Sequence, residues 1–113
     1  NVFPAHYKDD LLAFLRTYLN DPSHIKEAQV SAPVRKKMGL GERYITCMRF
    51  NARNADGKYL GSKESAAVYV DGKFNRYIDG GRDARESEAA RQVKDLCKDV
   101  PLAPFPELEK LTR

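Results

Sequence analysis

The sequence predicts an α+β domain: an N-terminal helix, then an antiparallel meander of three to four strands, then a C-terminal helix packed on one sheet face. Apolar residues recur at helical spacing near both ends of the chain, and the segment 43–53 is rich in aromatic and β-branched residues. Asp71-Gly72, between two apolar runs, is a strong hairpin signal. The 113 residues fit one domain. We therefore expect a single domain over 1–113, whose Pro-rich tail, 100–113, packs on it or extends from it.

The first helix is expected over residues 4–20. Pro4 suits the first turn of a helix, and Pro22 marks its end because the residue before a proline resists helical backbone angles. Residues 25–34 are expected to form a first strand, at a sheet edge because of Pro33, and residues 35–42 a loop. One apolar stripe would face the sheet from the helix: Leu11, Phe14, Leu15, Tyr18 and Leu19.

Three further strands and a second helix are expected beyond residue 42. The clearest strand is 43–53, which alternates and places Ile45, Cys47, Arg49 and Asn51 on one face. The next strands are expected at 58–70, with a bulge at 61–64, and at 73–78. The second helix is expected over 83–98, with Val93, Leu96 and Cys97 among the residues of its apolar side. The tail is expected to be extended, with one helical turn at 106–111.

Composition and motifs exclude several classes of protein. The 20 basic and 16 acidic residues leave a net charge of +4, which permits an anionic partner without requiring one. No apolar run approaches the roughly 18 residues of a membrane helix. No zinc, dinucleotide or P-loop pattern is complete, and no set of acid, base and nucleophile can be assembled. We therefore expect no enzymatic activity, no metal and no cofactor.

The two cysteines, Cys47 and Cys97, admit two interpretations from their spacing. They are either buried free thiols or the two halves of one disulfide in an exported protein. Cys47 falls on a central strand and Cys97 on the apolar side of the second helix. If that helix covers the face bearing Cys47, the two sulfurs come within bridging distance, so the placement favours a disulfide.

Residues 49–63 combine arginines, lysines, amides and a tyrosine around a predicted hairpin. Such side chains suit carboxylate, phosphate or glycan groups, which favours a recognition patch. The competing interpretation is an ordinary solvated hairpin with cross-strand polar pairs. The expected contact residues are Arg49, Arg53, Lys58, Tyr59 and Lys63, and an Arg53→Ala change is expected to weaken binding with little loss of stability.

The segments 7–22 (YKDDLLAFLRTYLNDP), 43–63 (RYITCMRFNARNADGKYLGSK) and 104–111 (PFPELEKL) resemble a known group. Together they are similar to small, uncharacterised exported proteins and lipoproteins of alphaproteobacteria, particularly the rhizobial group. The resemblance implies a compartment rather than a reaction. It implies a leader removed ahead of Asn1 and a periplasmic location, with the protein either free in the periplasm or anchored to the outer membrane through that leader region. An oxidising periplasm would also favour the Cys47–Cys97 disulfide.

The function that these observations favour is a non-enzymatic periplasmic binding or structural module. It would recognise an envelope protein or an anionic envelope component through its sheet surface or through the 49–63 hairpin. The alternative is a cytosolic nucleic-acid-binding or regulatory protein that uses the same basic residues and keeps two free thiols. The oligomeric state is left open.

Overall fold

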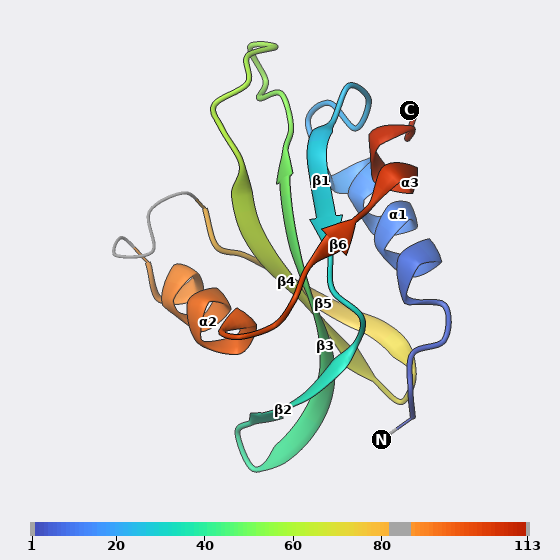
Figure 1. Ribbon diagram of the computed structural model, residues 1–113, viewed down its shortest axis with the longest axis vertical. Helices are drawn as coiled ribbons and strands as arrows, with labels where there is room; N and C mark the ends of the chain where they lie inside the picture. Colours follow the sequence, from blue (N-terminus) through green and yellow to red (C-terminus); the bar gives the residue numbers. More distant parts are fainter. Residues whose placement is uncertain (1, 82–86, 113) are drawn as a thin grey trace.

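The computed structural model describes residues 2–81 and 87–112, in which a six-stranded antiparallel sheet carries helices on both faces (Figure 1). The strand order is β5-β4-β3-β1-β6, and β2 also pairs with β3. The α+β class is thus confirmed, with more strands than expected. In chain order the elements are α1 (Tyr7–Tyr18), β1 (Lys26–Val30), β2 (Val34–Met38), β3 (Gly41–Asn51), β4 (Lys63–Val70), β5 (Lys73–Asp79), α2 (Glu88–Cys97), β6 (Ala103–Pro104) and α3 (Pro106–Glu109).

Strand β3 organises the sheet because it is long enough to pair with three other strands. One of its edges pairs with β4, and the other pairs with β2 near its start and with β1 near its end. At the junction between β1 and β2, Ser31 replaces a regular pair: its amide donates to the Cys47 carbonyl and its Oγ accepts from the Cys47 amide, both at 2.8 Å. β1 and β2 therefore lie end to end along one edge of β3.

The expected loop at 35–42 is wrong, because β2 occupies its first half and β3 begins at Gly41. A two-residue turn, Gly39-Leu40, joins β2 to β3, and Met38 pairs with Gly41. Gly39 has a φ of +62°, a value that glycine adopts without steric cost at the first position of such a turn. The three consecutive charges of Arg35-Lys36-Lys37 hid this strand, since they do not alternate in polarity.

The expected edge position of the first strand is also wrong. β1 lies between β3 and β6, because the tail returns to add β6 as a neighbouring strand. The Phe105 amide donates to the Ala28 carbonyl at 2.9 Å and continues this pairing. Pro33 does not interfere because β1 ends at Val30. The tail is therefore packed on the domain, and its helical turn is confirmed as α3.

The other strands follow the prediction with small changes. Asp71 and Gly72 have φ values of +53° and +82°, the two positive values of a type I′ hairpin turn, so this turn is confirmed. β4 begins at Lys63, which leaves residues 58–62 outside the strand and removes the bulge expected at 61–64. The irregularity lies instead in the pairing of β4 with β5, between Val68 and Tyr69.

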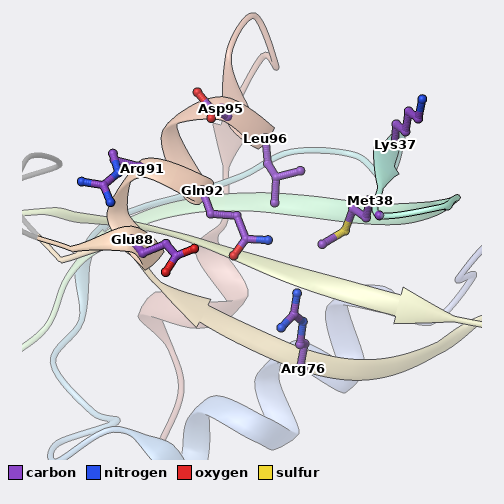
Figure 2. Close-up of a pocket in the computed structure, with 9 residues that line it drawn as sticks. Lys37, Met38, Arg76, Glu88, Arg91, Gln92, Asp95 and Leu96 are labelled. Carbon is purple, nitrogen blue, oxygen red and sulfur yellow. The ribbon is translucent and has the colours of Figure 1, made fainter.

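One face of the sheet is covered by α2 (Figure 2). The Ser87 side chain caps this helix by accepting a hydrogen bond from the Ala90 amide at 2.9 Å. Gly80 permits the close approach, because a Cβ there would lie 2.8 Å from the Glu64 carbonyl oxygen and 3.1 Å from the Val93 Cβ. The start expected at 83–86 lies outside the described residues. The core on this face consists of Ile45, Cys47, Ala66, Val68, Ile78, Val93 and Leu96.

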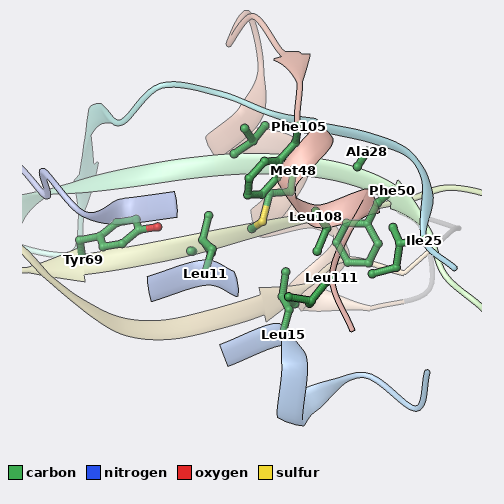
Figure 3. Packing of buried hydrophobic residues seen from close by; sticks show 12 residues of the cluster. Leu11, Leu15, Ile25, Ala28, Met48, Phe50, Tyr69, Phe105, Leu108 and Leu111 are labelled. Atoms are coloured by element: carbon green, nitrogen blue, oxygen red, sulfur yellow. The ribbon is translucent and has the colours of Figure 1, made fainter. Parts of the chain in front are cut away.

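The opposite face is covered by α1 and α3, so the helices do not share one sheet face as expected (Figures 1 and 3). Strand alternation explains this, since Met48 and Phe50 of β3 point away from Cys47 and need a cover of their own. This core is the larger one and consists of Leu11, Leu15, Ile25, Ala28, Val30, Met48, Phe50, Ala67, Tyr69, Phe105, Leu108 and Leu111.

Cys47 and Cys97 form a disulfide, with the two sulfurs 2.09 Å and the two Cα atoms 5.8 Å apart. The predicted pairing is thus seen in the structure, and it joins the end of α2 to the central strand. Among the described residues, no helix is both long and apolar enough to cross a bilayer.

Candidate binding surfaces

The five predicted contact residues lie in the 49–63 hairpin, but they do not form one free surface. Arg53 is held at the base of the hairpin. Its Nε donates to Asp21 Oδ2 at 2.6 Å, its Nη2 forms a closer ion pair with the same oxygen, and Nη2 also lies 2.9 Å from His24 Nδ1. The guanidinium is therefore committed to the loop that follows α1.

Asp21 is at the centre of this arrangement. Its Oδ1 accepts hydrogen bonds from the Ser23 hydroxyl at 2.6 Å and the Ser23 amide at 3.0 Å. The Ser23 hydroxyl, followed by the Arg53 guanidinium, lowers the pKa of Asp21 to about 2, against an opposing effect of partial burial. The Tyr59 hydroxyl donates to the His24 carbonyl. These contacts join the 49–63 hairpin to the loop after α1.

The other three predicted residues differ in how far they are engaged. Arg49 lies 3.9 Å from Glu64, and Lys63 lies 3.5 Å from Asp79, both as partly exposed ion pairs. Lys58 is exposed, and its ammonium group has no ion-pair partner among the described residues. Of the predicted set, Lys58 therefore offers the freest cation.

A groove that the sequence did not reveal runs between α2 and the end of the β2–β3 hairpin (Figure 2). Its volume is about 730 Å³. Arg76 rises into it from β5 below α2, the Met38 side chain points back toward the helix, and Asp95 lies at its outer rim. The lining residues are Lys37, Met38, Gly39, Arg76, Glu88, Arg91, Gln92, Asp95 and Leu96.

The sheet beside this groove is basic, as strand register shows. Directly paired residues of an antiparallel sheet point to the same face, and so do residues two apart along a strand. Lys36 pairs with Arg43, two residues before Ile45, and Arg76 pairs with Val68, so these cations share the face that α2 covers. Lys73 joins them through its pairing with Val70. We call Lys36, Arg43, Lys73 and Arg76 the basic half-face.

Among the described residues, the strands present no acid to the part of this face between Cys47 and the β2–β3 turn; Glu64, on the same face, lies beyond Cys47 and pairs with Arg49. The other described residues that β2 to β5 present to that part are Val34, Met38, Gly41, Ile45, Val68 and Val70. Neither Lys36, Lys73 nor Arg76 has an ion-pair partner among the described residues, and the Arg43 guanidinium donates to the Glu42 backbone carbonyl at 2.9 Å. A two-residue turn at Gly39-Leu40, had it been predicted from the sequence, would have paired Lys36 with Arg43. This turn is the sequence signal from which the surface could have been found.

Within the described part of the chain, no cluster of three or more histidine, cysteine or acidic side chains is arranged to hold a metal, and both cysteines are in the disulfide. No protein-family model, curated protein or solved structure matches the chain. The assignment of function therefore depends on the geometry of these surfaces.

Proposed function

We propose that the protein is a non-enzymatic binding module of the cell envelope. In this proposal it works in the periplasm, anchored to the outer membrane through a removed leader region, and recognises an envelope protein or an anionic envelope component. Contact is made through the basic half-face and the groove between it and α2, and not through the 49–63 hairpin. The observation that carries the proposal is the direct cross-strand pairing of Lys36 with Arg43.

Two like charges directly opposite on neighbouring strands destabilise a sheet. A sequence selected for stability alone would place an acid at one of these positions. An anionic partner relieves the repulsion and gains charge-assisted hydrogen bonds, two of them from each arginine where the geometry is bidentate. The unfavourable pair is therefore consistent with a surface kept for binding.

The compartment in the proposal is supported by the disulfide, since such bonds persist in oxidising compartments. The competing cytosolic protein would keep both thiols reduced. It would also bind DNA or RNA with a steep dependence on salt. We expect unchanged electrophoretic mobility of both nucleic acids at low salt, and a shift that vanishes with added salt would favour the competing function.

The decisive variant is Lys36→Glu. It replaces a cation pair with an opposite-charge pair to Arg43, so the free energy of unfolding should rise by up to about 1 kcal/mol. Binding to the envelope fraction of the producing cells should fall about tenfold or more, because the partner loses a cation and meets an anion. Denaturant titration and a quantitative sedimentation assay measure the two effects on the same protein.

Lys58→Glu is the matched control, because it makes the same charge change on the exposed hairpin. We expect it to leave both stability and envelope binding unchanged. If Lys58→Glu abolishes binding and Lys36→Glu does not, the contact surface is the hairpin. If the wild-type protein binds no envelope fraction, the proposal fails as a whole.

A further inference from the structure

We infer that the groove beside α2 receives an amphipathic helix of a partner protein. Its acidic side chains would face the basic half-face and its basic side chains would face α2. This inference rests on the proposed function and names the partner class for that same surface. The evidence is the charge pattern on the two sides of the groove: α2 on one side, and on the other Arg76, which lines the groove and belongs to the adjoining basic half-face.

The α2 wall of the groove is mixed in charge. Glu88, Arg91, Gln92, Asp95 and Leu96 line it, and their spacing places them along one side of the helix. Neither Glu88 nor Asp95 has an ion-pair partner among the described residues. A uniform polyanion such as a phosphate polymer would be attracted by the sheet and repelled by both carboxylates. A protein segment meets both walls by presenting acids on one side and a lysine or arginine on the other.

The base of the groove is apolar enough to hold such a segment. Met38 is half-buried and points toward Leu96 of α2 (Figure 2). Val34 and Val70, on the same face, are also only half-buried, so α2 leaves part of this face open. A helix occupant buries its apolar stripe on these side chains and lies alongside α2 at an ordinary interhelical distance of about 8–10 Å.

The length of α2 sets the scale of the occupant. Ten residues make a helix about 15 Å long, so the matching segment has about three turns. Such a segment is short for a stable isolated helix, and it would fold as it binds.

The first test uses two synthetic peptides of about 14 residues, or four helical turns. One places glutamates, leucines and lysines on three separate stripes, and the other has the same composition with these positions permuted. Backbone amide NMR of the full chain should show shifts at residues 34–43, 70–76 and 88–96 with the striped peptide alone. Lys36→Glu and Arg76→Glu should weaken this binding about tenfold, and Lys58→Glu should not. Equal binding of the two peptides, or no shift with either at about 1 mM, overturns the inference.

The second test separates this inference from the proposed function. The envelope fraction is digested with a protease before the binding assay, with polyphosphate and anionic phospholipid vesicles as further probes. The inference expects binding that depends on Lys36 to disappear after digestion, and neither probe to bind comparably. If such binding survives digestion, the partner is a non-protein anion: the inference is overturned and the proposed function stands. If no Lys36-dependent binding exists before digestion, both fail.

A second copy of this chain is the remaining occupant to distinguish. Light scattering over a range of concentrations should show a monomer in the absence of partner. A dimer that Arg76→Glu dissociates would make the occupant another copy of this chain and overturn the inference.

Discussion

At the scale of single residues, Arg53 has a structural role that its position in a polar hairpin did not reveal. Arg53 follows the end of β3 by two residues, and the fold brings it to Asp21, 32 residues earlier in the chain. Burial of about two thirds of its side chain strengthens the pair relative to a fully solvated one. Arg53 therefore holds the 49–63 hairpin to the loop after α1, although the sequence predicted that it contacts a binding partner.

Arg53→Ala should lower the Tm by about 5 °C, because it leaves Asp21 and the base of the hairpin without their shared partner. Arg49→Ala is the matched control, since Arg49 makes only a long, exposed pair with Glu64. Its Tm should stay within about 2 °C of the wild-type value. Calorimetry measures both, and an Arg53→Ala protein with unchanged Tm but weakened envelope binding would restore the hairpin as the contact surface.

Asp21 should make stability depend on pH in a defined window. Its pKa is about 2 in the folded protein and near 3.8 when unpaired, so the folded state favours the carboxylate. The resulting stabilisation is present above about pH 4 and is lost as the pH falls toward 2. The Tm advantage of the wild type over Asp21→Asn should shrink across this window. A carboxyl NMR titration with a midpoint near 4 would contradict the assignment.

At the scale of elements, the C-terminal segment is part of the core rather than an appendage. Phe105 and Leu108 are fully buried, and the Ala28 amide donates to the Glu109 carboxylate at 2.9 Å. β6 gives β1 a second neighbour, so the segment completes both the sheet and the larger core. Three prolines suggested an extended tail, but proline restricts hydrogen bonding and not burial.

Phe105→Ala should therefore lower the free energy of unfolding by about 3–5 kcal/mol, the usual cost of a large cavity in a core. Phe3→Ala is the matched control, because Phe3 is about half exposed and contacts Tyr44 edge to face. The control should cost about 1 kcal/mol or less. Denaturant unfolding compares the two, and similar losses would mean that the tail is not part of the cooperative core.

At the scale of the whole molecule, the disulfide joins the layer formed by α2 to the sheet. It closes a loop of 50 residues between β3 and the end of α2. In the chain-entropy model such a crosslink stabilises the folded state by about 4 kcal/mol. The bond therefore keeps α2 in place as one wall of the groove.

The disulfide predicts a specific labelling result. Intact mass after alkylation under denaturing, non-reducing conditions should show no label, and two labels should appear after reduction. A Cys47→Ser, Cys97→Ser protein should unfold at a lower denaturant concentration, consistent with a loss of about 4 kcal/mol. Two labels without reduction, in protein from its producing cells, would indicate free thiols and favour the cytosolic alternative.

Much of the fold was predictable because it depends on local pattern. The stripe of α1, the alternation of β3 and the Asp71-Gly72 turn are each encoded within a few residues, and all three were found. β2 was missed because it is short and highly charged, and β6 because two residues carry no periodic signal. The exported group that the chain resembles remains a prediction.

The candidate site was less predictable, because it depends on register between strands. The sequence determined the α+β class, the modest charge excess, and that Cys47 and Cys97 lie on elements able to meet. Only the tertiary structure decided that Lys36 faces Arg43, that Arg53 is held by Asp21, and that helices cover both faces. The physical reason is that local propensity sets which residues form an element, whereas cross-strand pairing and long-range packing set which charges become neighbours.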